Sequence, residues 1–315
     1  MSTDPCDNQS RCKDACLPFY ADCDYIFQDV IVTPAREGGT LVQWQLSSHI
    51  RDEGDYLFTL QVGNAGVSDP KAWKDVETKV DACHFIDRIR RLPGAYSFTH
   101  YRLKLETSEA VYFSRPIHTF GKLNYADYQQ YKAIIRTEGI QLASNDGTRG
   151  TLLKRKISGR KCPRCIDFGT GEVKDGNCKF CYGTGWIGGY YEPIPCFYIN
   201  LQPMGSTIKA EVEMQGQVAD TQSVGRAIAS PILISGDVWV SGESSERFRI
   251  MQLKHLVEMR GIPVVYQVGL ERIPFSDVVY DFPLQWRNGH PGRSTKKMGG
   301  SGEVDRLTED SDDQP

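Results

Sequence analysis

The sequence predicts a mainly β protein in which two β domains flank a small cysteine-bearing unit. Short runs of alternating apolar residues, separated by turn residues, begin near Asp29, and a second series begins near Pro195. Two Cys-x-x-Cys pairs lie between the two series. One stretch, Leu123–Ile140, instead has the three- and four-residue spacing of a helix.

The composition is that of a globular chain long enough for two or three domains. Of the 315 residues 40% are hydrophobic, and the formal net charge is −3, so the chain as a whole is not a polyanion binder. No run reaches the roughly 18 apolar residues of a membrane helix. The segment that starts at Met1 lacks the basic and apolar regions of a secretory signal, so we expect synthesis in the cytoplasm.

Residues 1–27 are expected to form a polar N-terminal arm. The arm carries four of the ten cysteines: Cys6, Cys12, Cys16 and Cys23. It has too few apolar residues to fold alone, so it needs a covalent staple or a partner. Disulfides and a second metal site are both open for these thiols. The isolated Cys83 and Cys196 are expected to be small buried side chains.

Residues 28–118 predict an antiparallel sandwich. The run Tyr101–Leu105 alternates with period two, so Tyr101, Leu103 and Leu105 should share a buried face. The order of landmarks resembles a fibronectin type III or similar immunoglobulin-like domain: Trp44, Tyr56–Leu60, Trp73, Tyr101–Lys104 and Ser114–Pro116. The resemblance implies a two-sheet fold, into which the basic segment Val80–Leu92 fits as an insertion.

Residues 119–156 are interpreted as a helical connector. Within it the helical spacing over Leu123–Ile140 has Asn124 as a plausible cap and Gly139 as a plausible stop. A loop is expected over Ser144–Gly147.

Residues 157–194 hold the strongest motif of the chain. Two Cys-x-x-Cys pairs are separated by twelve residues, and the four cysteines are Cys162, Cys165, Cys178 and Cys181. Each pair can reach one ion from a tight turn, and four thiolates complete the tetrahedron that Zn²⁺ prefers. Glycines follow each pair in Gly-Thr-Gly triplets at Gly169 and Gly183, where the backbone can curl toward the sulfurs.

This unit resembles a zinc ribbon, and its second half is similar to the zinc repeat of a class of heat-shock chaperones. Four cysteine ligands leave no open coordination position, so the expected role of the Zn²⁺ is structural. Two disulfides or a redox pair are the alternatives. The redox alternative needs a thioredoxin-like βαβ context, which the sequence pattern does not provide.

Nucleic-acid contact is a further hypothesis for the ribbon. It rests on basic and aromatic residues, which together can grip phosphates and stack on bases: Lys154, Arg155, Lys156, Arg160, Lys161, Arg164, Phe168, Phe180, Tyr182 and Trp186. The simpler interpretation is a solvated face beside a small aromatic core. The acidic neighbours Asp167, Glu172 and Asp175 favour this second interpretation.

Residues 195–285 predict a second β domain, barrel-like or a sandwich. The strands are expected over Pro195–Leu201, Thr207–Met214, Gly236–Val240, Phe248–Val257 and Ile262–Ile273. Arg260-Gly261 should join the last two as a hairpin. Residues 286–315 are rich in Gly, Ser, Lys and Asp and are expected to be a flexible tail.

No catalytic motif emerges from the sequence, and we expect no enzymatic activity. The six histidines are scattered, without a His-x-x-x-His pair, and no phosphate-binding or nucleophile-elbow motif is found.

The C-terminal region carries the resemblance that bears most on function. Five segments are similar to small β proteins of the neck, or head-to-tail connector, of tailed bacteriophages: Gly236–Trp239, Arg247–Ile250, Glu258–Pro263, Leu270–Asp277 and Val279–Pro283. The resemblance implies a virion structural protein that forms a ring with copies of itself and contacts portal, neck or tail proteins. In such a particle at least two cysteines of the arm would be oxidised to disulfides.

Two other functions remain open from the sequence. One is a zinc-ribbon nucleic-acid-binding protein. The other is a chaperone-like or adhesin-like module whose immunoglobulin-like domain binds a peptide or a glycan. The modular plan favours attachment and assembly over chemistry.

Overall fold

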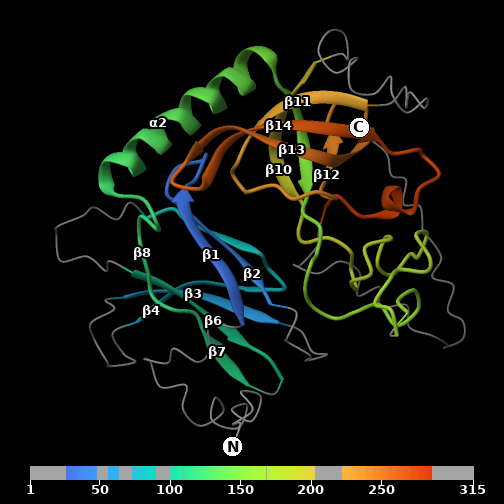
Figure 1. Cartoon of the computed structure of the whole chain (residues 1–315), viewed down its shortest axis with the longest axis horizontal. Helices are drawn as coiled ribbons and strands as arrows, with labels where there is room; N and C mark the ends of the chain where they lie inside the picture. Colours follow the sequence, from blue (N-terminus) through green and yellow to red (C-terminus); the bar gives the residue numbers. More distant parts are fainter. Residues whose placement is uncertain are drawn as a thin grey trace, which may run out of the picture.

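The computed structural model describes residues 26–47, 56–63, 73–89, 100–108, 110–167, 169–202 and 222–285. It confirms the mainly β fold: two sheets and a closed barrel, with one long α-helix along one side of the molecule (Figure 1). The cysteine arm 1–27, all but its last two residues, lies outside the described residues, as does the tail 286–315. The strand expected over Thr207–Met214 lies outside them as well.

The N-terminal β region consists of two antiparallel sheets that face each other. The first sheet has the order β1-β2-β5, with β1 at Phe27–Pro34, β2 at Thr40–Leu46 and β5 at His84–Asp87. The second has the order β4-β3-β6-β7, with β8 paired to β6. Its strands are β3 at Leu57–Gly63, β4 at Lys74–Val80, β6 at His100–Glu106, β7 at Val111–Phe113 and β8 at Ile117–His118.

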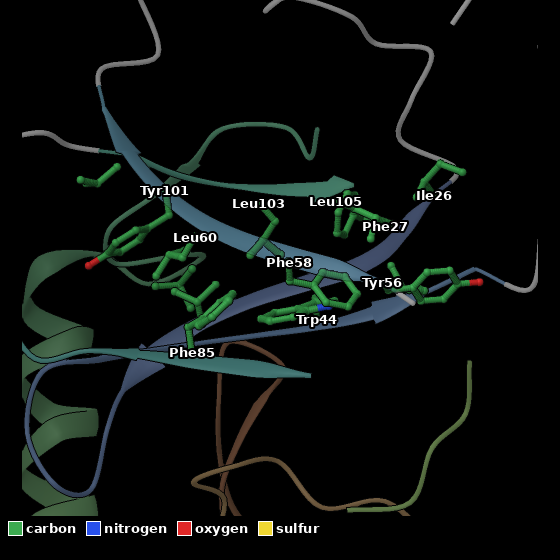
Figure 2. Close-up of a cluster of buried hydrophobic side chains, with 14 residues drawn as sticks. Ile26, Phe27, Trp44, Tyr56, Phe58, Leu60, Phe85, Tyr101, Leu103 and Leu105 are labelled. Carbon is green, nitrogen blue, oxygen red and sulfur yellow. The ribbon is translucent and has the colours of Figure 1, made fainter. Parts of the chain in front are cut away.

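An aromatic core joins the two sheets (Figure 2). The Trp44 ring lies 5.0 Å from that of Phe58 and 5.1 Å from that of Phe85, so one indole contacts both sheets. The predicted buried face of β6 is confirmed, because its two leucines and Tyr101 are at most 1% exposed. Offset aromatic pairs of this kind contribute about 0.5–1.5 kcal/mol each beyond the area they bury.

The interpretation of Val80–Leu92 as an insertion is wrong for the part that the structure describes. Strand β5 lies within it and pairs with β2, and Phe85 at its centre is fully buried. The basic residues that suggested an insertion begin at Arg88, just after the strand ends. A four-residue strand is too short to show a periodic pattern beside such charges.

The predicted helix is confirmed as α2, Tyr125–Gln141, but it does not end at Gly139 as predicted. Asn124 caps it, its Oδ1 accepting from the N–H of Asp127 at 2.8 Å. The helix continues through Gly139, and the π-helical η4, Leu142–Asp146, replaces most of the expected loop. Leu142 is 3% exposed, and its burial favours continuing the helical conformation beyond Gly139.

The second β region is a closed six-stranded barrel of order β10-β11-β14-β13-β12-β9. The strands are β9 at Thr148–Leu153, β10 at Ile194–Gln202, β11 at Gln222–Ile228, β12 at Val238–Ser241, β13 at Arg247–Met259 and β14 at Ile262–Arg272. A 3-10 helix, η5 at Val278–Asp281, follows. The Arg260-Gly261 hairpin is confirmed, and both residues have the positive φ that a type I′ turn requires.

The barrel begins earlier in the chain than the predicted boundary at residue 195. Strand β9 falls inside the stretch interpreted as a helical connector, 119–156, yet it pairs with both β10 and β12. Its first four residues, Thr148–Thr151, have no apolar alternation that a sequence pattern could reveal. Gly150 is required because a Cβ there would lie 2.4 Å from the indole nitrogen of Trp239.

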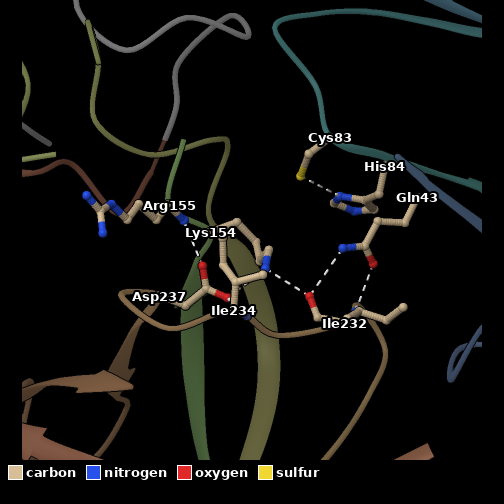
Figure 3. A network of polar contacts seen from close by, with 8 residues as sticks. All are labelled: Gln43, Cys83, His84, Lys154, Arg155, Ile232, Ile234 and Asp237. Atoms are coloured by element: carbon tan, nitrogen blue, oxygen red, sulfur yellow. Dashed lines mark hydrogen bonds and ion pairs between the residues drawn. The ribbon is translucent and has the colours of Figure 1, made fainter. Parts of the chain in front are cut away.

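A polar network joins the sandwich to the barrel (Figure 3). The Gln43 side chain on β2 donates from Nε2 to the carbonyl of Ile232 at 3.2 Å. Its Oε1 accepts from the Ile232 N–H at 2.8 Å. The same carbonyl accepts from Lys154 Nζ at 2.8 Å, so the sandwich, the barrel and the residue that directly follows β9 meet at Ile232.

Lys154 also forms a buried ion pair with Asp237. The two side chains are 3% and 0% exposed, and Nζ lies 2.6 Å from Oδ2. The carboxylate accepts two further hydrogen bonds, from the N–H groups of Arg155 at 2.8 Å and Ile234 at 2.9 Å. Burial raises the pKa of Asp237, while Lys154 and the backbone donors act to lower it. A buried charge of this kind is tolerated only when it is paired and hydrogen-bonded.

Candidate metal centre

The four cysteines predicted as ligands come together in one cluster. Their ligand atoms all lie within 4.8 Å of one another, and the side chains are at most 6% exposed. They belong to the connection between β9 and β10, where two tight turns face each other. The spacing in the sequence therefore identified a real constellation.

Both close sulfur–sulfur distances are longer than a disulfide bond, and the Cys162–Cys178 distance equals the edge of a tetrahedron around a zinc ion. Each close pair joins one turn to the other: Cys162 Sγ lies 3.8 Å from Cys178 Sγ, and Cys165 Sγ lies 3.0 Å from Cys181 Sγ. A disulfide would bring the sulfurs to about 2.05 Å, and all four cysteines are free thiols here. Bonds of about 2.3 Å to a central metal give tetrahedral edges of about 3.8 Å.

Backbone hydrogen bonds shape the two turns. In the first the Ile166 N–H donates to the Cys162 carbonyl at 3.2 Å, and in the second the Tyr182 N–H donates to the Cys178 carbonyl at 2.8 Å. The two turns are joined by the Cys162 N–H, which donates to the Gly185 carbonyl at 2.8 Å. The cluster is thus held by main-chain geometry on both sides.

Glycine is required after the second pair. Gly183 has φ +74°, and a Cβ there would lie 2.6 Å from the carbonyl oxygen of Gly176. Gly185 has φ +84°, and a Cβ there would lie 2.9 Å from Val173. By contrast Gly171, in the first triplet, has the same φ as Gly183 but open space around it. The second turn is therefore the more tightly packed of the two.

The thiol groups differ in how readily they lose a proton. Burial raises the pKa of Cys165 and also that of Cys181, and for Cys165 the neighbouring thiols add to the effect. Burial opposes ionisation of Cys178 too, but hydrogen bonds from the N–H groups of Phe180 and Cys181 outweigh it and lower its pKa. Because a metal binds thiolates, loading of this cluster releases protons and weakens as the pH falls.

The cysteine unit is fastened to both β regions. On one side Lys156 Nζ pairs with Asp81 of the sandwich and donates to the Ile187 carbonyl at 3.1 Å. On the other side the Phe282 ring, just after η5, lies 5.1 Å from the ring of Tyr182 and 5.3 Å from that of Tyr190.

The basic run before the cysteines is not one continuous surface. Lys154 and Lys156 are 3% and 5% exposed and are used in the ion pairs described above. Arg164 is exposed but stacks on the ring of Phe180, with Cζ 3.8 Å from the centroid. Phe168 lies outside the described residues. Two of the six basic residues that suggested nucleic-acid contact are therefore internal to the fold, whereas Arg160, Lys161 and Arg164 are exposed.

Cys83 and Cys196 have different environments. Cys83 is buried as predicted, and its Sγ lies 3.6 Å from Nδ1 of His84. Burial raises the pKa of Cys83 to about 12 and lowers that of His84 to about 3, so both are neutral near pH 7. The prediction for Cys196 is wrong: it is half-buried, has φ +59° at a bulge of β10, and accepts from Arg149 Nη2 at 3.0 Å.

Scans of the chain against known protein families and against curated proteins found no match. In the part of the chain that the structure describes, no helix is long and apolar enough to cross a membrane.

Proposed function

We propose that this chain is an architectural protein in which a bound metal ion couples two β regions into one rigid building block. The observation that carries the proposal is the placement of the four-cysteine cluster. The cluster lies in the connection between the neighbouring barrel strands β9 and β10. This connection contacts the sandwich through Lys156, and its Tyr182 and Tyr190 contact Phe282 just after the barrel. A metal there would stabilise the interface as well as its own loop.

Zn²⁺ is the ion that we propose for this site. Four thiolates in a tetrahedron suit zinc, with an iron centre as the chemical alternative. Such a closed ligand set has no free position for a substrate or a water, so the ion would stabilise the fold and take no part in a reaction. We propose further that the chain as a whole has a structural and not a catalytic role.

The particle in which we place this building block is the neck of a tailed bacteriophage, with the chain repeated in a ring. Support comes from the sequence resemblance of the C-terminal segments, and a rigid two-domain block is a suitable unit for cyclic assembly. Portal, neck or tail proteins would then be its neighbours in the virion.

Two measurements test the proposal. Elemental analysis of the purified full chain should give one zinc per chain, and Cys162→Ser and Cys178→Ser should each release it. Cys196→Ser, which alters a thiol outside the cluster, should retain it. Iron in place of zinc, with its visible absorbance, would disprove the assignment of the metal; absence of any metal would disprove the coupling role.

The second measurement concerns assembly. If the chain is a neck protein, tailed particles made from the genome that encodes it should contain it in a small fixed copy number by quantitative mass spectrometry. Its absence from intact particles, or a monomeric state in the presence of all connector components, would reject the virion role while leaving the metal site in place.

A further inference from the structure

A cavity of about 290 Å³ lies between the second cysteine turn and the barrel. One wall comes from the cysteine unit and includes Asn177, Tyr182 and Tyr190. The opposite wall comes from the barrel and includes Arg249, near the start of β13, and Asp277, at the cap of η5. The cavity exceeds the space for one water molecule, about 10–15 Å³, many times over.

The guanidinium groups of two arginines reach this cavity, and one of them is without an ionic partner. The main chain of Arg155 is fixed by its N–H to Asp237, while its side chain extends away from the Lys154–Asp237 pair (Figure 3). Among the residues that the structure describes, the only side-chain hydrogen bond of this guanidinium is one of 3.5 Å to the Thr184 carbonyl, and no carboxylate pairs with it. A half-buried, unpaired arginine in a cavity is an incomplete electrostatic arrangement.

Arg249 is also only weakly neutralised. Its Nη2 lies 3.6 Å from Oδ2 of Asp277, a distance beyond a good hydrogen bond, and its side chain is 39% exposed. The lining therefore contains two positive charges and one negative charge. Burial raises the pKa of Tyr190 to about 12, although both arginines act to lower it, so its hydroxyl remains a neutral donor near both guanidiniums.

We propose that this cavity is a binding site for inorganic phosphate, held between Arg155 and Arg249. Guanidinium forks match the oxygens of such an oxyanion, and the Tyr190 hydroxyl and Asn177 amide add neutral donors. The site is independent of the assembly role proposed above, since it depends only on the folded single chain.

Asp277 sets the chemistry of the anion. A carboxylate in the cavity repels an oxyanion that can only accept hydrogen bonds, but it accepts one from an oxyanion that carries a proton. Hydrogen phosphate carries such a proton at neutral pH, whereas sulfate does not. A phosphodiester of nucleic acid also lacks the proton and should bind poorly. Asp277 therefore acts as a specificity residue, selecting phosphate over sulfate.

The test is calorimetric titration of the metal-loaded full chain with sodium phosphate, in parallel with sodium sulfate and with a short DNA oligonucleotide. We expect saturable binding of phosphate, with sulfate at least tenfold weaker and the oligonucleotide unable to compete. Arg155→Gln and Arg249→Gln should each weaken phosphate binding at least tenfold. Arg164→Gln, in the same unit but stacked on Phe180 outside the cavity, is the matched control and should bind as the native chain does.

Asp277→Asn tests the selectivity separately. An asparagine retains the Oδ1 that accepts from the Val279 N–H at 2.9 Å, so the cap of η5 is preserved. We expect the preference for phosphate over sulfate to fall toward unity. Metal content and near-ultraviolet circular dichroism identify any variant that has lost its fold, and Arg155→Lys, which keeps the charge without the fork, should bind with intermediate affinity. The proposal is overturned if phosphate does not bind at millimolar concentration, if both arginine variants bind it normally, or if DNA competes.

Discussion

The side-chain amide of Gln43 forms two hydrogen bonds with the main chain of Ile232, of 3.2 Å and 2.8 Å, and so extends strand-like pairing from the sandwich to the barrel. An amide is the side chain that suits this arrangement, because it offers one donor and one acceptor to a main-chain N–H and C=O. The two β regions are therefore aligned by a specific pair of hydrogen bonds between Gln43 and Ile232, as well as by apolar contact.

The first prediction concerns this pair. Gln43→Glu keeps the acceptor for the Ile232 N–H but replaces the donor with an oxygen that faces the Ile232 carbonyl. We expect the free energy of unfolding to fall by about 1–3 kcal/mol, because the Ile232 carbonyl keeps the Lys154 donor but loses the Gln43 donor and faces a new charge. Gln45→Glu, on the same strand but half-buried, should change it by about 0.5 kcal/mol or less. If Gln43→Glu and Gln45→Glu lower the free energy of unfolding equally in urea denaturation, the Gln43–Ile232 pairing is not the cause.

The second prediction concerns the buried pair of Lys154 and Asp237. Lys154→Met should destabilise the fold by about 3–5 kcal/mol, because it leaves a buried carboxylate without its cation. Adding Asp237→Asn should recover part of this loss, since the charge disappears while the amide oxygen still accepts a main-chain N–H. A double variant less stable than Lys154→Met would show that the charge is not the cause.

The matched control is Lys179→Met, which breaks the exposed ion pair of Lys179 and Asp281. The two side chains are 78% and 58% exposed, so Lys179→Met should change stability by less than about 1 kcal/mol.

The third prediction compares two glycines with the same backbone conformation. Gly171 and Gly183 both have φ +74°, so alanine is strained at either position by about 1 kcal/mol or more. Only at Gly183 would the new Cβ also collide with a carbonyl, that of Gly176. With zinc bound as we propose, Gly183→Ala should therefore release it to a colorimetric chelator much faster than Gly171→Ala. Similar release rates would show that packing around the second turn does not control metal retention.

The fourth prediction is a dependence on pH that originates in His84. Burial lowers the pKa of His84 to about 3, and nearby Lys79 and Lys154 add to this effect. An unfolded histidine titrates near 6.5. The stability contributed by the neutral ring is therefore complete above about pH 6.5 and is lost as the pH falls from there toward 3.

Between pH 7 and pH 5 the native chain should lose about 1–2 kcal/mol more than His84→Gln does. The comparison removes the acid sensitivity of the metal site, which both proteins share. The measurement is urea unfolding of the metal-loaded proteins at each pH. Equal losses would show that His84 is not the group responsible.

The sequence predicted the parts of this protein that depend on local pattern. The four cysteines, the cap at Asn124 and the hairpin at Arg260-Gly261 are each encoded within a few residues, and the structure has them as predicted. Strand β9 and the end of α2 were missed because partners distant in the sequence determine them. Topology overrides local propensity at such positions.

The polar centre of the molecule was also beyond the reach of sequence patterns. Lys154 and Asp237 are 83 residues apart, and the lysine was interpreted as one of several surface charges. Only the barrel, by placing β9 beside β12, brings the two side chains together. A charged residue next to an apolar strand can thus be buried, but nothing in its immediate neighbours reveals which residue will pair with it.

The β9–β10 connection has a consequence for the order in which the chain folds. Its ladder continues into the cysteine unit, where the Lys156 N–H donates to the Gly189 carbonyl at 3.0 Å and the Tyr191 N–H to the Lys154 carbonyl at 2.9 Å. Closing the barrel must wait until β12 and β14 leave the ribosome, whereas the turns of the unit need only nearby residues. A metal captured early would hold the first two barrel strands as a hairpin, and the remaining strands would then add to a template already in place.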